Sequence, residues 1–398
     1  MKRFDKFYVD KKILKFVSLI SILPFMLFFS ACSAKQRSYP PSPTEDYTKA
    51  TIMGYTNIRY WGDKTAHYTY TRENLKRLEA NKTFRKRIDI LALSGGAEDG
   101  AYGAGFLKGW SERGDRPQFT VVTGISTGAL IAPFAFMGSK YDNVIQRLYT
   151  ESSQKNIVLF SPIEALFGAS LGDSAPLRKI LTEEINDVFV ADLAKEASKG
   201  RMLQIGTTNL DAQRPVVWDI TKIALSGRSD APKLIRDIML ASSSIPGVFP
   251  PVLIDVVING KKHEEVHVDG GVTRQIFVYP RDLDIRKLQR MLHIHPQQNM
   301  WLIRNTKVDP EYKPVSLSVS DVAERSIYTL TKYQGLGDLV NIISLAKRDG
   351  FNVQITNVPK SFDVPLKEVF DKKYMNALYQ VGYEKGRSKS AWNTTLNY

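Results

Sequence analysis

Residues 119–137 read FTVVTGISTGALIAPFAFM, and the kind of regular structure that they favour changes in the middle of the stretch. The first part, FTVVTGIS, is short and rich in β-branched residues, which predicts a strand. The second part, TGALIAPFAFM, predicts a buried helix that Pro133 kinks or restarts. Ser126 lies between them in a G-x-S-x-G sequence, on a sharp strand-to-helix turn. This context suits a nucleophile, because the N-terminus of the following helix favours developing negative charge.

Strand-like and helix-like runs alternate on both sides of this stretch. RIDILAL (87–93) predicts a strand, and GAYGAGFLKGWSE (100–112) has helical spacing. VLIDVVI and EEVHVDGG flank Asn259-Gly260, which predicts a hairpin. Further helices are expected over 176–187, 189–199, 231–244, 284–292, 317–348 and 366–388, and further strands over 201–210, 214–220, 300–304 and 351–358. Such alternation predicts an α/β layer fold with a mainly parallel sheet.

Two more glycine-rich segments follow predicted strands. SGGAEDGAYGAG (94–105) could turn several backbone N–H groups toward one point and so form an anion cradle, although a tight turn is the simpler interpretation. It is neither a Walker loop nor the dinucleotide fingerprint. Asp269-Gly270-Gly271 ends a predicted strand and exposes a carboxylate, although a plain Asp-Gly turn would look the same.

A possible zinc motif overlaps the second of these segments. His263 to His267 reads H-E-x-x-H, which binds zinc in proteases when both histidines lie on one helical face. Here Asn259-Gly260 lies just before and Asp269 just after, so the interval is too short for a stable helix. As a strand it places His263, Glu265, His267 and Asp269 on one face. We therefore predict no metal site and no cofactor.

Four blocks, in order, resemble the patatin-like phospholipase family. They are the glycine-rich segment from Gly95 to Gly100, the nucleophile sequence around Ser126, ASSSIPGVFPPV (241–252), and Asp269-Gly270-Gly271. The resemblance spans about residues 88–275. It implies a three-layer α/β/α fold, and a serine–aspartate dyad that hydrolyses fatty acyl esters of phospholipids or lysophospholipids through an acyl-enzyme. The residues to which it assigns roles are the catalytic Ser126 and Asp269, the oxyanion-hole Gly95, Gly96 and Ala97, and the elbow glycines Gly124 and Gly128.

Two other functions remain open on the sequence alone. An α/β-hydrolase triad in the order Ser…Asp…His could use His293 or His295. The chain could also be a non-catalytic envelope lipoprotein that binds lipid. It departs from the family at Asp99, where an Arg or Lys is usual, and at Ala97, where a third Gly is usual. We expect Asp99 to cap the following helix, so that its loss would cost about 1 kcal/mol.

The N-terminal segment predicts export and a lipid anchor. A basic stretch (1–15) precedes the apolar FVSLISILPFMLFF (16–29), which is short for a membrane span and is interrupted by Pro24. Cys32, the only cysteine, follows in a sequence that resembles the lipobox of bacterial lipoproteins. That resemblance implies diacylation of Cys32 and attachment to the cell envelope. The residue after the cysteine is Ser33, which resembles the pattern of lipoproteins that are sorted to the outer membrane.

The predicted organisation follows from these segments. We expect a signal peptide over 1–31, a Pro/Ser-rich tether over 32–50, an N-terminal extension over 51–87 and a catalytic domain over 88–398. The net charge of +14 suits an anionic membrane surface, and we found no nucleic-acid-binding motif. The expected partners are therefore the lipid substrate and the membrane, not nucleic acid.

Overall fold

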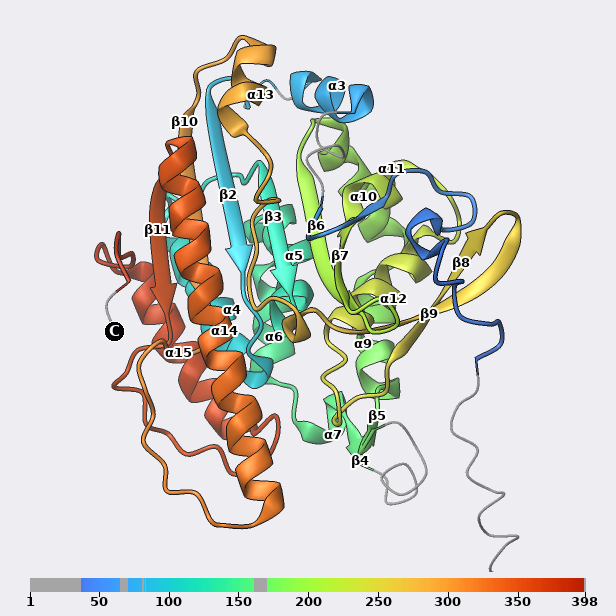
Figure 1. Cartoon of the computed structure of the whole chain (residues 1–398). Coiled ribbons are helices and arrows are strands. Elements are labelled where there is room, and N and C mark those ends of the chain that lie inside the picture. Colours follow the sequence, from blue (N-terminus) through green and yellow to red (C-terminus); the bar gives the residue numbers. More distant parts are fainter. Residues whose placement is uncertain (1–36, 65–70, 81, 83, 161–169, 397–398) are drawn as a thin grey trace, which may run out of the picture.

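The computed structural model describes residues 37–64, 71–80, 82, 84–160 and 170–396. Within these residues nine strands form one sheet that lies between two layers of helices (Figure 1). The predicted three-layer α/β/α architecture is therefore confirmed. The predicted signal segment and Cys32 lie outside the described residues. Among the residues described, no helix is both long and apolar enough to span a membrane.

The sheet has a parallel centre and antiparallel margins. Its order is β1-β7-β6-β3-β2-β10-β11, and β9, followed by β8, pairs with one end of β6. The strands from β6 to β11 in this order pair parallel, whereas β1, β7, β8 and β9 pair antiparallel. The strands are β1 Arg59–Trp61, β2 Arg87–Leu93, β3 Val121–Ile125, β6 Met202–Asn209, β7 Arg214–Asp219, β8 Val252–Ile258, β9 Lys261–Asp269, β10 Gln297–Arg304 and β11 Asn352–Asn357; β4 Leu159–Phe160 and β5 Gly172–Asp173 form a separate pair.

Two groups of helices cover the two faces of the sheet. Figure 1 shows α14 in front of the sheet and α5 behind it. The first group is α3 Arg72–Ala80, α13 Ile285–Leu292 and α14 Val319–Asp349. The second group is α4 Gly100–Arg113, α5 Thr127–Met137, α6 Asp142–Thr150, α9 Ala175–Glu184, α10 Asp187–Ser198, α11 Ile220–Leu225, α12 Ala231–Ser242 and α15 Lys372–Arg387, with the short α7 Gln154–Ile157 near the β4–β5 pair.

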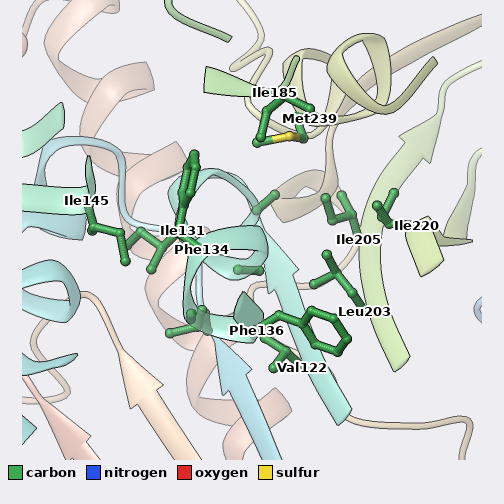
Figure 2. Close-up of a cluster of buried hydrophobic side chains, with 14 of the residues drawn as sticks. Val122, Ile131, Phe134, Phe136, Ile145, Ile185, Leu203, Ile205, Ile220 and Met239 are labelled. Carbon is green, nitrogen blue, oxygen red and sulfur yellow. The ribbon is translucent and has the colours of Figure 1, made fainter. Parts of the chain in front are cut away.

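The side chains of β2 show how the two cores form. Ile88 and Ile90 belong to the hydrophobic cluster with α3, α13 and α14, whereas Leu91 and Leu93 belong to the cluster with α4, α5 and α15. Because successive side chains of a strand point to opposite faces, an almost wholly apolar run is needed when both faces are covered. Figure 2 shows part of the larger cluster, where Phe136 lies beside Val122 of β3 and Leu203 of β6, and Phe134 lies toward Ile131 and Ile145.

Three local expectations need adjustment. Pro133 neither ends nor restarts the helix, which continues from Thr127 to Met137. The helical pattern near 317–348 forms one helix, α14. The chain from Arg37 onward lies against β9 instead of extending freely, because Arg37 binds Asp211 and the Glu264 carbonyl.

Candidate active site

Ser126 occupies a strained turn between β3 and α5. Its φ and ψ are 54° and −125°, in the left-handed half of the backbone map, which a non-glycine residue rarely adopts. The neighbouring glycines are required by close backbone contacts. A Cβ on Gly124 would meet the carbonyl of Gly128, and a Cβ on Gly128 would meet the carbonyl of Leu93. The predicted nucleophile elbow is therefore present with both of its glycines.

Strand pairing places Asp269 beside Ser126. Ile125, the last residue of β3, pairs with Gly206 of β6. The next residue of β6, Thr207, pairs with Asp269 at the end of β9. Because β7 occupies the other edge of β6, β9 takes the edge that β3 leaves when the chain turns out of the sheet at Ser126. The Ser126 hydroxyl donates to Asp269 Oδ2 at 2.5 Å.

The carboxyl group of Asp269 is shielded from water. The residue is 5% exposed, and its Oδ1 accepts the backbone N–H of Gly271 at 2.7 Å. Burial raises the pKa of Asp269 to about 7, although the hydrogen bonds from Ser126 and Gly271 act in the opposite direction. A carboxylate with this pKa is a better proton acceptor near neutral pH than an ordinary aspartate.

The block at 241–252 supports the Ser126 backbone from behind. The Ser126 N–H donates to the Ser242 hydroxyl at 3.0 Å, and that hydroxyl donates to the Gly206 carbonyl at 2.7 Å. The Ser243 hydroxyl lies 3.3 Å from the Ser126 carbonyl oxygen, to which it donates. The sequence marked this block only through its family resemblance, and the structure gives it contacts with the nucleophile.

The glycine-rich loop lies directly against Ser126. A Cβ on Gly95 would come within 3.2 Å of the Ser126 Cβ. The Gly95 N–H, which we expected in the oxyanion hole, donates to the Gln275 carbonyl at 3.0 Å, so this donor is occupied in this structure. In the described residues, the N–H groups of Gly96 and Ala97 have no hydrogen-bond acceptor. Sequence reasoning missed Gln275, whose amide also donates to the Gly271 carbonyl and so joins the two loops.

Asp99 is not the helix cap that we expected. Its side chain makes no capping hydrogen bond. Instead, Oδ1 accepts the hydroxyl of Tyr374, a residue of α15, at 2.5 Å. Burial raises the pKa of Asp99 to about 7. The acidic residue therefore joins the loop to the C-terminal helix, a contact that no local pattern predicts.

The remaining glycines of the segment serve helix packing. A Cβ on Gly105 would meet the Tyr379 carbonyl of α15. A Cβ on Gly382 would likewise meet the Tyr102 carbonyl of α4. The absence of side chains at these positions lets the two helices approach at backbone distance. The glycine-rich segment thus has two functions: its first part shapes the site, and its last part packs α4 on α15.

The histidines lie away from the serine or are already paired. His293 and His295 precede β10, whose first residue pairs with the first residue of β2, whereas Ser126 lies beyond the carboxyl ends of these parallel strands. Because β10 rises about 3.3 Å per residue, these histidines lie roughly 25 Å from Ser126. His267 binds Glu265 through Nε2 and Thr207 through Nδ1. No described histidine therefore completes a triad with Ser126 and Asp269.

The H-E-x-x-H sequence forms part of β9, as we expected from its flanking turns. His263 binds the Pro41 carbonyl at 3.1 Å, whereas His267 binds the Glu265 carboxylate of the same strand. Among the described residues, no group of three or more His, Cys, Asp or Glu side chains is placed to hold a metal ion. The two histidines thus have separate hydrogen-bond partners.

An apolar pocket opens beside Ser126. It encloses about 680 Å³, including space open to solvent. Ala97 and Ser126 lie in its wall, so it reaches both the loop and the nucleophile. Its apolar lining comes from α5, α6, α7 and α9 and from three residues outside these helices, Ile245, Phe249 and Phe370; the helical residues are Leu130, Phe134, Leu148, Ile157, Leu177, Ile180 and Leu181. Such a pocket suits a flexible hydrocarbon chain attached to an ester at Ser126.

The chain is similar to one described protein family and to several solved structures. Residues 91–280 match the family model for patatin-like phospholipases. Among solved structures, the chain is similar to VipD from Legionella pneumophila, at 12% identity and a TM-score of 0.31, over 76% of this chain and 66% of that one. It is also similar to the heterodimeric ExoU–SpcU complex of the Pseudomonas aeruginosa type III secretion system, at 15% identity and a TM-score of 0.29, over 76% and 50% of the two chains.

The chain thus spans about two thirds of the length of the first of these structures and half of the second. No curated protein matches it. The family match includes the elbow serine, the aspartate that binds it, the glycine-rich loop and the block behind the serine. Residues 91–280 of the chain form a patatin-like phospholipase domain.

Proposed function

We propose that the protein is a serine acyl hydrolase that cleaves fatty acyl esters of phospholipids or lysophospholipids. The observation that carries this proposal is the hydrogen bond of 2.5 Å from the Ser126 hydroxyl to the buried Asp269 carboxyl group. An apolar pocket begins at the same serine. A nucleophile, a base and a place for an acyl chain are therefore adjacent.

The reaction follows from this arrangement in two halves. Asp269 accepts the hydroxyl proton as Ser126 Oγ attacks the acyl carbon, which forms a tetrahedral oxyanion. The oxyanion collapses to an acyl-enzyme, and the departing alcohol of the lipid takes the proton from Asp269. Water then attacks the acyl-enzyme while Asp269 accepts its proton. Collapse of the second oxyanion releases the fatty acid and returns the proton to Ser126.

The oxyanion is stabilised by the loop next to the serine. The free N–H groups of Gly96 and Ala97 are its donors in this proposal, since Gly95 already binds Gln275. Backbone donors fixed in a shielded site are effective because they need no reorganisation when charge develops. The acyl chain enters the apolar pocket, whose lining favours hydrocarbon over a polar group.

The test is a panel of phospholipids and lysophospholipids presented as vesicles and as mixed micelles, with fatty acid release as the readout. We expect turnover by the unmodified protein on at least one class of lipid and none by the Ser126→Ala variant. Lipid binding without fatty acid release would favour the non-catalytic lipoprotein. Equal release by both proteins would contradict Ser126 as the nucleophile.

Activity is expected to rise with pH because the base must be ionised. Asp269, whose pKa is about 7, is mostly protonated below that pH and accepts a proton only above it. We therefore expect kcat/KM to increase about tenfold per pH unit below about pH 7 and to level off above it. The measurement is kcat/KM across about pH 5.5 to about pH 8.5 with a substrate that does not itself titrate. A flat profile would exclude Asp269 as the rate-controlling base.

We also propose that Cys32 is diacylated and anchors the protein in the cell envelope, at the outer membrane. The support is the basic and apolar sequence before Cys32, together with the net charge of +14, which suits an anionic lipid surface. The anchor would hold the enzyme beside its substrate.

Replacement of Cys32 by serine is expected to abolish fatty acid labelling and to move the protein out of the membrane fraction, because one thiol carries the whole anchor. Metabolic labelling with radioactive palmitate, followed by membrane fractionation, measures both effects. Ser33→Ala is the matched control and should be labelled like the unmodified protein. Undiminished labelling of the Cys32→Ser protein would disprove the anchor.

A further inference from the structure

Asn305 joins the two ends of the glycine-rich loop. It directly follows β10 and lies outside the residues that match the family model. At one end of the loop, its backbone N–H donates to the Ser94 hydroxyl and its Nδ2 donates to the Ser94 carbonyl, both at 2.8 Å. At the other end, its Oδ1 accepts the Gly103 N–H at 3.1 Å. The residue is completely buried, so water does not replace these bonds.

Gly103 is the fourth residue of α4, which begins directly after the loop. Asn305 accepts its N–H with the same amide that holds Ser94 at the end of β2. One side chain therefore fixes the distance between the strand and the helix that the loop connects.

The loop needs this restraint because its backbone is strained. Gly96 has a φ of 153°, and Ala97 has a φ of 48°, a left-handed conformation that is unfavourable for a residue with a side chain. The space beside Gly96 is closed by Asn305, whose carbonyl oxygen would lie 2.6 Å from a Cβ at that position. Without the restraint, Ala97 could relax to negative φ, and the N–H groups of Gly96 and Ala97 would turn.

We propose that Asn305 is the positioning residue of the oxyanion hole. It touches neither substrate nor Ser126 and acts by holding the Gly96 and Ala97 N–H groups toward the reacting carbonyl. This inference rests on the proposed function, because it assigns a role within that site. It gives the C-terminal part of the chain, beyond the family match, a role in positioning the groups that bind the oxyanion.

The test compares Asn305→Ala with Asn299→Ala. Asn299 lies on β10, the strand that Asn305 follows, is 6% exposed, and donates to Asp89 at 3.0 Å near the other end of that strand, so it is a matched buried asparagine. For each purified variant, kcat and KM are measured, together with the inhibition constant of a long-chain alkyl trifluoromethyl ketone. Such a ketone forms a tetrahedral adduct with the serine and therefore reports on oxyanion binding.

For Asn305→Ala we expect kcat to fall about 100-fold, KM to stay within about threefold, and the inhibition constant to rise about 100-fold, as for the loss of one oxyanion donor. Asn299→Ala should lower thermal stability without this separation of kcat from KM. Ser94→Ala removes the hydroxyl that accepts the Asn305 N–H and that donates to the Gly95 carbonyl at 2.7 Å, while the Asn305 side chain stays in place. It should show the same pattern with a smaller effect, which keeps the test valid if Asn305→Ala does not fold.

Similar kinetics for the variants at Asn305, Ser94 and Asn299 would overturn the positioning role, since only general stability would then be affected. The failure of the proposed function looks different. In that case even the unmodified protein shows no turnover that depends on Ser126.

Discussion

Replacing Asp269 with asparagine is expected to lower kcat by about 10³-fold or more, which is within the range for loss of a general base. Asparagine has nearly the same shape but cannot accept the Ser126 proton. Because the two side chains have nearly the same size, the substitution should disturb the other contacts of Asp269 little. Among these contacts is the hydrogen bond from the Gly271 N–H. Fatty acid release at about pH 8, where Asp269 is ionised, measures the effect.

The controls for this prediction are His293→Ala and His295→Ala. Both histidines are exposed and lie at the end of the sheet away from Ser126. Each variant should therefore retain kcat within about threefold, because surface substitutions usually have small effects. If either histidine proves indispensable while Asp269→Asn remains active, the dyad is wrong and a triad must be sought.

Replacing Ser126 with alanine is expected to lower kcat by about 10⁴-fold or more, because no acyl-enzyme can form. The matched control is Ser244→Ala in the block behind the site. Ser244 is fully buried, but its hydroxyl donates to the carbonyl of Leu240, one helical turn earlier in the chain, and not to Ser126. Ser244→Ala should retain kcat within about tenfold.

Binding separates this loss of chemistry from a loss of structure. The apolar pocket beside Ser126 remains in the alanine variant, so vesicle co-sedimentation should be unchanged. A variant that lost both turnover and lipid binding would show that the substitution disturbed the fold. A variant that kept turnover would remove Ser126 from the mechanism.

The elbow could be predicted because its requirements are local. A strand, a sharp turn and a helix follow each other within 119–137, and the two glycines next to Ser126 are required by contacts with nearby backbone. The parallel centre of the sheet could be predicted for the same reason, since strand–helix alternation is visible along the chain. The boundaries of β2 and α5 agree with the sequence patterns.

The meeting of Ser126 and Asp269 required the strand order. The sequence places an aspartate at the end of a strand, but not on the edge of β6 that β3 has just left. The family resemblance supplied that pairing in advance. The contacts of Asp99 with Tyr374 and of Asn305 with Ser94 are equally long-range, and the family resemblance did not predict them.

The close packing of α4 on α15 could be predicted only in part. Gly105 and Gly109 are four residues apart on α4, and Gly382 and Gly386 are four apart on α15. Each pair marks a helix face that another backbone approaches closely. The sequence shows both faces but does not show that they pack together.

If Asp269 activates Ser126 for attack on a lipid ester, it also activates Ser126 toward a long-chain alkyl fluorophosphonate, which forms a covalent adduct with the serine. The rate of adduct formation is measured, and the modified residue is located by peptide mass spectrometry. We expect a single adduct at Ser126 that forms about 100-fold more slowly in Asp269→Asn. An adduct on another residue, or an unchanged rate in Asp269→Asn, would show that Asp269 does not activate Ser126.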